Sequence, residues 1–471
     1  MLLTRTLSPE DFGLWNIINS MIGYVIIMEP MISYWSTREI ARGTDSGKTS
    51  IISSGIFSLG AIIVYSIITF LFHGSSSISF EVLFFGAILI PVMFLNKTLT
   101  AINLAWKPHA ISYGVILFGI SQIIMAYILL VVFEMGISGI ILSVTFGYLM
   151  GNIALLIFAK EKLKDNFQIK FIKKWLRLSW ISFYPEAYTL FTNSYVIIFV
   201  LITNSVESIG FWSAALILSS VVGNAALISR GVYPKLLGTK NRDYVQNNIT
   251  HLFYFAIPLV SLVIVFSKPG LYALNPIYES VYPVVIITAI MSFFYNLTMI
   301  FQSFSLGTEN VDLSENSSTK EFLKSKLFLN PSVLLIQSIV YAISLSIGLL
   351  ILLPISTMND LLIFWAILAV VTQIPVCIYF YRKAQKKINF NLEFFTILKY
   401  ILASVVVFGI TYLISESYLI YDDNLLQFLP HLMIFGIIGV FGYLGFTYLI
   451  DKKTRLLFNA IFSEFKKIIS F

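Results

Sequence analysis

Long apolar runs alternate with short polar segments along the whole chain. A helix that spans a membrane needs about 20 consecutive, mainly apolar residues, and 13 runs reach that length. They are Phe12–Ser36, Ile51–Phe72, Val82–Asn103, Ala110–Phe133, Ile137–Ala159, Leu178–Thr203, Phe211–Ser229, Gln246–Ser267, Tyr282–Leu306, Ser332–Leu353, Leu361–Tyr381, Thr396–Ser415 and Pro430–Ile450. The pattern predicts an all-α polytopic membrane protein with about 13 transmembrane helices.

Composition supports this class and excludes others. Hydrophobic residues make up 58% of the 471 residues and charged residues 12%, about half the usual soluble share of roughly 25%. Soluble enzymes, nucleic-acid binders and disordered scaffolds are therefore excluded. The single cysteine, Cys377, rules out an internal disulfide and a cysteine-based metal site, and the four histidines are scattered. We expect no metal and no cofactor.

Basic residues between the runs orient the chain. Of the 31 Lys and Arg residues, 28 fall in segments on one side, Arg5 and Lys268 fall on the other, and Lys97 lies inside a run. Basic loops mark the cytoplasmic side. The alternation predicts a multi-pass protein of the cell (plasma) membrane, with a cytoplasmic C-terminus and Met1 outside.

Two basic segments are amphipathic. Lys160–Arg177 has apolar residues four apart with lysines between them, namely Leu163, Phe167, Phe171 and Trp175. Thr454–Phe471 also gathers its apolar residues on one face. Both predict helices that lie in the inner membrane interface, although a plain basic loop is an alternative for the first segment.

The chain contains an internal repeat. Ser8–Trp15 matches Ser205–Trp212 in the pattern Ser-x-Glu-x-Φ-Gly-Φ-Trp, where Φ is apolar, at an offset of 197 residues that also maps Arg38 onto Lys235. Each copy lies in a predicted outer turn, where glycine would allow a tight turn into the next helix. Chance combined with generic turn chemistry is the alternative. Repeated halves in one orientation predict a pseudo-two-fold axis along the membrane normal and alternating access around a central site.

The repeat predicts the domain organisation. Residues 1–159 form an N-terminal lobe, 160–177 a cytoplasmic linker, 178–381 a C-terminal lobe, 382–450 two additional helices and 451–471 a cytoplasmic tail. The first residues, Met1–Arg5, have the character of the end of a helix that arrives from the cytoplasm. We therefore expect an earlier helix to be missing; a short translocated tail is the alternative.

The local motifs resemble a known family. Arg5-Thr-Leu-Ser-Pro-Glu-Asp-Phe-Gly13-Leu-Trp, followed by Thr37-Arg-Glu-Ile-Ala-Arg42-Gly, resembles the first helical hairpin of polysaccharide-export flippases. Ser208-Ile-Gly210-Phe-Trp-Ser-Ala-Ala resembles its counterpart in the second half. These flippases belong to the multidrug/oligosaccharidyl-lipid/polysaccharide exporter (MOP) superfamily, whose members look like fourteen helices in two six-helix lobes plus two. The earlier helix that we expect to be missing would correspond to the first, cavity-lining helix of the family.

The resemblance implies a function. It implies a monomeric transporter, not an enzyme, that flips an oligosaccharide linked to polyprenyl phosphate or pyrophosphate from the cytoplasmic to the outer leaflet, for cell-surface polysaccharide or glycan biosynthesis. Its partners would be membrane lipids and, in that pathway, glycan polymerases or glycosyltransferases, with no nucleic acid.

Three charged residues inside the runs are candidates for gating or coupling. Glu29 precedes Pro30, Lys97 follows Asn96, and Glu186 follows Pro185. At about 1.5 Å per residue, all three would lie roughly 8–12 Å inside the inner boundary, so they could meet. Ionisable groups at membrane depth are costly and usually functional. A structural pair, or snorkelling of Lys97, is the alternative, and coupling to H⁺ or Na⁺ stays open.

Three further cations are candidates for binding the substrate headgroup. Arg38, Arg230 and Lys235 lie at the predicted cytoplasmic ends of helices in the two repeats. The planar arginine fork can bind phosphate oxygens in a bidentate manner. The alternative is that these residues belong to the ordinary basic boundary of the membrane.

Two other functions compete with a flippase. A multidrug exporter would have the same fold but would bind small cations. A membrane glycan polymerase or glycosyltransferase would need a sizeable outer loop or a paired-carboxylate site at the membrane edge, whereas the predicted outer loops are short and the acidic pair Asp422-Asp423 in the last of them is expected to be solvated surface.

Overall fold

We describe a computed structural model of the chain, in which residues 2–76, 78–177, 179–225, 242–306, 323–388, 390 and 392–459 are described. Within these ranges all regular secondary structure is helical, so the predicted fold class is confirmed. In this described part of the chain, eleven helices are long and apolar enough to cross a membrane, or 12 if one bent pair is a single span. The remaining predicted span, Phe211–Ser229, coincides with a shorter apolar helix and continues into residues outside the described ranges, so the count of 13 stays a prediction.

The described chain forms two compact units. Unit 1 contains residues 1–213 and 327–358, and unit 2 contains residues 214–326 and 359–471. The predicted lobes were defined by position along the sequence, whereas these units are defined by contacts in space. The predicted lobes therefore stay a prediction.

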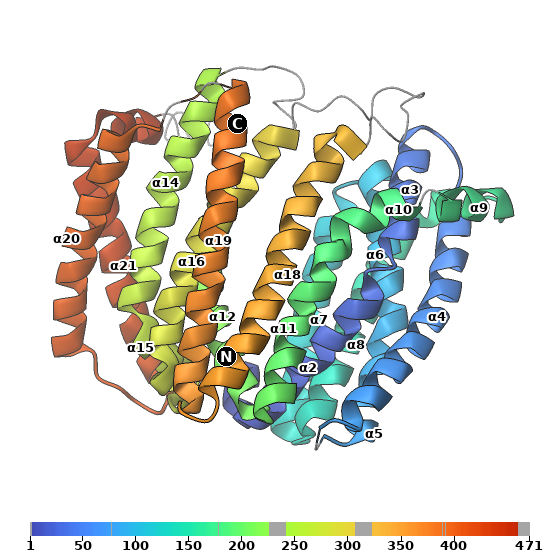
Figure 1. The fold of residues 1–471 in the computed structure, drawn as a ribbon, viewed down its shortest axis with the longest axis horizontal. Helices are drawn as coiled ribbons and strands as arrows, with labels where there is room; N and C mark the ends of the chain where they lie inside the picture. Colours follow the sequence, from blue (N-terminus) through green and yellow to red (C-terminus); the bar gives the residue numbers. More distant parts are fainter. Residues whose placement is uncertain are drawn as a thin grey trace. The chain divides into compact units, whose positions relative to one another are not determined.

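Helices α1 to α11 belong to unit 1, and Figure 1 shows their order along the chain. They are α1 (Leu2–Thr6), α2 (Pro9–Ile26), α3 (Pro30–Ala41), α4 (Gly47–His73), α5 (Phe80–Phe85), α6 (Leu89–Trp106), α7 (Ala110–Ala126), α8 (Gly136–Ala159), α9 (Ile169–Arg177), α10 (Ser179–Phe183) and α11 (Ala187–Thr203). Helix α12 (Glu207–Gly223) begins in this unit, and nearly all of α18 (Lys326–Leu352) belongs to it.

The core of unit 1 is built around α6. Helices α3, α4 and α8 all pack against it, and α7 pairs with α8 as an antiparallel hairpin. Polar side chains connect α6 to α8. The Asn96 side chain donates to the Asn152 side chain at 2.8 Å, and Asn103 donates to the Leu155 carbonyl at 3.0 Å. Such bonds stabilise helix packing inside a membrane, where water cannot compete.

The predicted amphipathic linker is a helix over only part of its length. Helix α9 runs across the end of α4 in Figure 1 and packs on α3 and α4. Its Phe171 and Trp175 are buried with Ile32 and Trp35 of α3. Phe167, expected on the same apolar face, lies before the helix and is 40% exposed. The apolar face therefore covers the protein itself at Phe171 and Trp175.

The described part of unit 2 contains the other long helices and the short helix α15. They are α14 (Arg242–Val265), α15 (Ser267–Leu274), α16 (Tyr282–Leu306), α19 (Met358–Ile388), α20 (Phe394–Tyr418) and α21 (Leu425–Ile450). Helix α14 packs against α16, α20 and α21. Tyr254, Tyr400 and Tyr443 are fully buried where α14, α20 and α21 meet. This contact holds α20 against α14 and so shapes the pocket described below.

Candidate functional site

A break between α2 and α3 places Glu29 inside the protein. Proline lacks a backbone N–H and collides with the carbonyl four residues earlier, so it interrupts a helix. Helix α2 ends at Ile26, α3 begins at Pro30, and the two helices meet at an angle of 57°. Glu29 lies at this bend with its side chain buried. The Glu29–Pro30 pair thus combines a kink with a buried carboxyl group.

The Glu29 carboxylate joins α3 to α6. It accepts hydrogen bonds from Ser33 Oγ at 2.9 Å and from Thr98 Oγ1 at 3.2 Å. Thr98 is also fully buried. Burying a carboxylate costs free energy that hydroxyl donors offset only in part, so a role beyond packing would account for its presence.

Lys97 is the basic residue whose charge acts on the Glu29 carboxylate. It is adjacent to Thr98 on α6, its side chain is exposed, and it interacts electrostatically with Glu29. Two of the three predicted gating residues thus interact electrostatically.

Glu186 lies elsewhere in unit 1. It ends the short turn Tyr184–Glu186 and is half-buried, like every residue from 183 to 198. Its neighbour Tyr184 pairs with Ser332 of α18 at 2.6 Å. Among the described residues, no hydrogen bond or ion pair joins Glu186 to Glu29 or Lys97. Glu186 therefore makes no polar contact with Glu29 or Lys97 in this structure, and the gating roles of the three residues stay predictions.

Of the three predicted headgroup cations, only Arg38 lies in the described ranges. Its guanidinium carbon is 4.5 Å from the centre of the Tyr34 ring, in the last turn of α3. Arg230 and Lys235 lie outside the described residues. The expected pairing of Arg38 with Lys235 therefore stays a prediction.

Glu39, which follows Arg38, is a further charged residue at this end of α3 that the sequence pattern did not predict. Its side chain is 8% exposed and forms an ion pair with Lys174 of α9 at 2.6 Å. Together with the Trp35–Trp175 contact, this pair fixes the linker helix next to Arg38. A glutamate among basic residues at a helix end, facing an amphipathic segment, is the sequence signal that could have identified it.

The two copies of the repeat contact each other. A Cβ atom on Gly13 would lie well under 3.0 Å from the Val206 carbonyl oxygen, and one on Gly210 equally close to the Pro9 carbonyl oxygen. Pro9 and Val206 are themselves equivalent at the offset of 197 residues. The contact is thus reciprocal, as across a local two-fold axis.

Serine, and not glycine, makes the turn in each copy. The Ser8 hydroxyl accepts a hydrogen bond from the Asp11 backbone N–H at 3.0 Å, and the Ser205 hydroxyl accepts one from the Ser208 N–H at 3.3 Å. Gly13 lies inside α2 and Gly210 inside α12. The expectation that these glycines permit a tight turn was wrong: they permit two backbones to approach closely.

Comparison with known proteins identifies the architecture. No family model and no curated protein matches the sequence. Among solved structures, the lipid II flippase MurJ in an inward closed conformation matches with a TM-score of 0.64 and 18% identity, over 95% of this chain and 94% of that chain.

Multidrug exporters match less completely. An inward-facing multidrug resistance MATE transporter of the MOP superfamily gives a TM-score of 0.59 at 13% identity, over 82% of this chain and 92% of that chain. The Vibrio cholerae MATE transporter VcmN in its bent form gives 0.52 at 12%, over 81% and 96%. The protein therefore has the fold of the multidrug/oligosaccharidyl-lipid/polysaccharide exporter superfamily.

Proposed function

We propose that the protein flips a polyprenyl-linked oligosaccharide from the cytoplasmic to the outer leaflet of the cell membrane by alternating access. The observation that carries this proposal is the extent of the likeness to the lipid II flippase, 95% of this chain. An alignment that covers 95% of the chain must include part of α20 and α21, the last two long helices. The alignments with the two MATE transporters cover 82% and 81% of the chain, and an alignment of that extent does not need to include α20 and α21.

The reciprocal glycine contact supports alternating access. It brings together the starts of α2 and α12, which charge patterning assigns to the outer side. Two backbones that touch at this end form a seal that must separate when the outer side opens. Transporters built from repeats are expected to open and close in this way.

Glu29, Lys97 and Glu186 are the proposed gating and coupling groups. The buried carboxylate at the Pro30 break could change its interactions with Ser33, Thr98 and Lys97 as α3 moves. Intramembrane ionisable residues commonly have such roles. Whether H⁺ or Na⁺ takes part is open to measurement with the same vesicles that test transport.

Arg38, Arg230 and Lys235 are the proposed headgroup ligands. Arg38 is half-buried at the end of α3, beside the docked α9. An anionic phosphate that leaves the inner leaflet would meet arginine donors there. Glycosyltransferases that build the lipid-linked glycan, and polymerases that use it, would be the partners in the pathway.

Transport of the lipid-linked glycan by the purified chain tests the proposal. The full chain would be reconstituted into vesicles that contain a fluorescent oligosaccharide on polyprenyl pyrophosphate, and a membrane-impermeant lectin would report its appearance on the other side. We expect glycan exposure above that of empty vesicles. Ethidium efflux would be measured in parallel, and efflux without glycan exposure would favour a multidrug exporter.

A further inference from the structure

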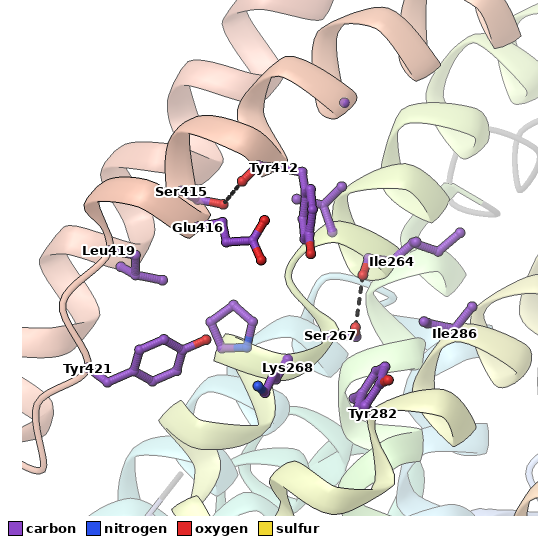
Figure 2. Close-up of a pocket in the computed structure, with 13 residues that line it drawn as sticks. Ile264, Ser267, Lys268, Tyr282, Ile286, Tyr412, Ser415, Glu416, Leu419 and Tyr421 are labelled. Atoms are coloured by element: carbon purple, nitrogen blue, oxygen red, sulfur yellow. Dashed lines mark hydrogen bonds between the residues drawn. The ribbon is translucent and has the colours of Figure 1, made fainter.

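Unit 2 contains a pocket that none of the proposed transport residues lines. It has a volume of about 600 Å³ and lies where α14 ends and α15 and α16 begin, against the last turns of α20 (Figure 2). A volume of about 300–1,000 Å³ is typical of sites for small molecules. The charge pattern places this end of the helices on the outer side of the membrane.

One wall of the pocket is apolar. Ile264 and Val265 of α14 and Ile286 of α16 line it. Gly409 of α20 completes this wall, and a Cβ atom at Gly409 would meet no heavy atom within 4 Å. Gly409 is exposed, and open space beside an apolar wall on a membrane-spanning helix suits an acyl chain.

The mouth of the pocket has a different chemistry. Tyr282, Tyr412 and Tyr421 line it together with Glu416. Figure 2 shows the Glu416 carboxylate beside Tyr412 and facing the open space. Tyrosine is common at membrane interfaces, but here three tyrosines from different segments line the same pocket as one carboxylate.

The charge at the mouth favours a cation. Lys268, also at the mouth, forms an ion pair with Glu279 at 3.1 Å, and this hydrogen bond raises the pKa of the lysine. The positive charge of Lys268 is thus offset by Glu279. Among the described residues, no ion pair involves Glu416. A carboxylate among aromatic rings is the arrangement that recognises ammonium groups.

We propose that this pocket binds an outer-leaflet glycerophospholipid whose headgroup has an ammonium group, such as phosphatidylethanolamine. Glu416 and the Tyr412 ring bind the ammonium, and one acyl chain lies along Ile264, Ile286 and Gly409. Lysine has three donors, so Lys268 can donate to the phosphate while it remains paired with Glu279. The site is independent of the transported substrate, so it does not rest on the proposed function.

Competition between two lipids tests the headgroup preference. The full chain, purified in detergent, would be given equal amounts of phosphatidylethanolamine and phosphatidylglycerol with identical acyl chains, and bound lipid would be counted by native mass spectrometry. We expect phosphatidylethanolamine to be favoured by roughly threefold, as fits exposed ammonium contacts. Equal binding or a preference for phosphatidylglycerol would overturn the proposal.

Variants at the mouth test the ammonium contacts. Glu416→Gln should abolish the preference, whereas Glu81→Gln, an exposed carboxylate in unit 1, should retain it. Tyr412→Phe should keep the preference because the ring remains, and Tyr412→Leu should reduce it. An unchanged preference in Glu416→Gln would contradict the assignment.

A variant in the apolar wall separates chain binding from headgroup binding. Gly409→Leu should fill the open space and reduce retention of both lipids by several-fold. Gly445→Leu on α21 is the matched control because a Cβ atom there also meets nothing and Gly445 does not line the pocket. Equal lipid retention in the two folded variants would show that the pocket holds no acyl chain.

Discussion

Gly13 and Gly210 occupy equivalent positions in the two copies of the repeat, and a Cβ atom on Gly13 would lie 3.0 Å from the Gly210 backbone nitrogen. Helices α2 and α12 can approach this closely only because neither residue has a side chain. A short pattern recognised in the sequence thus marks the point at which its own two copies meet.

Alanine at either glycine should destabilise the protein. The added methyl group would overlap backbone atoms of the other copy, which cannot move aside independently, and overpacking of this kind costs about 1–3 kcal/mol. Because both overlaps are relieved by separating the same two helices, the double variant should cost less than the sum of the single variants. Thermal unfolding in detergent would measure this. Gly55→Ala, where a Cβ atom meets nothing, is the control and should not lower the melting temperature.

Glu29→Gln should reduce glycan transport and leave the amount of folded protein unchanged. The amide keeps one acceptor oxygen and removes the charge. Thr98→Val removes one donor to the carboxylate and should instead reduce stability by about 1–3 kcal/mol. Glu186→Gln should behave like Glu29→Gln. Full transport in both glutamine variants would contradict gating by these carboxylates, and loss of folded protein would indicate a structural role.

Arg38→Lys tests whether Arg38 binds phosphate. Lysine keeps the positive charge and can still stack on the Tyr34 ring, but it cannot form a bidentate fork. We therefore expect slower translocation of the lipid-linked glycan in Arg38→Lys, and likewise in Arg230→Lys, at matched expression. Wild-type rates in both variants would leave the residues as ordinary boundary cations.

The Glu39–Lys174 ion pair should stabilise the docked linker helix. Lys174→Met leaves the largely buried Glu39 carboxylate without its cation, and Glu39→Gln leaves Lys174 without its anion. Each variant should therefore lower stability. The double variant should lose less stability than the sum of the two single variants. In the control pair Lys162–Asp45 the carboxylate is 52% exposed, against 8% for Glu39, so Asp45→Asn should change stability by less than about 1 kcal/mol. Protease cleavage within the linker would report release of α9.

Cysteine labelling tests the predicted orientation. On intact cells, an impermeant thiol reagent should label Ser75→Cys, in the turn after α4, and should not label Asn166→Cys, in the basic linker. Both residues are exposed, so a difference would reflect the membrane and not burial within the protein. The buried Cys377 would be replaced by serine in both variants. Labelling of both sites, or the reverse pattern, would refute the predicted topology.

The sequence alone determined which segments are helices. A segment inside lipid must satisfy its backbone hydrogen bonds internally, so an apolar run of sufficient length, such as Gly47–His73, becomes a helix whatever its neighbours are. Local chemistry likewise predicted the apolar face that contains Phe171 and Trp175. The break at Pro30, inside the predicted span Phe12–Ser36, was revealed only by the structure.

Tertiary structure decided which side chains meet. Thr98 reaches Glu29 from 69 residues away and Lys174 reaches Glu39 from 135 residues away. The pocket likewise joins residues from Ile264 to Tyr421. Periodicity shows which face of a helix is apolar, but the partner of that face depends on how helices pack in three dimensions. The glycines illustrate the difference: the repeat revealed their equivalence, and only packing revealed that they allow α2 and α12 to touch.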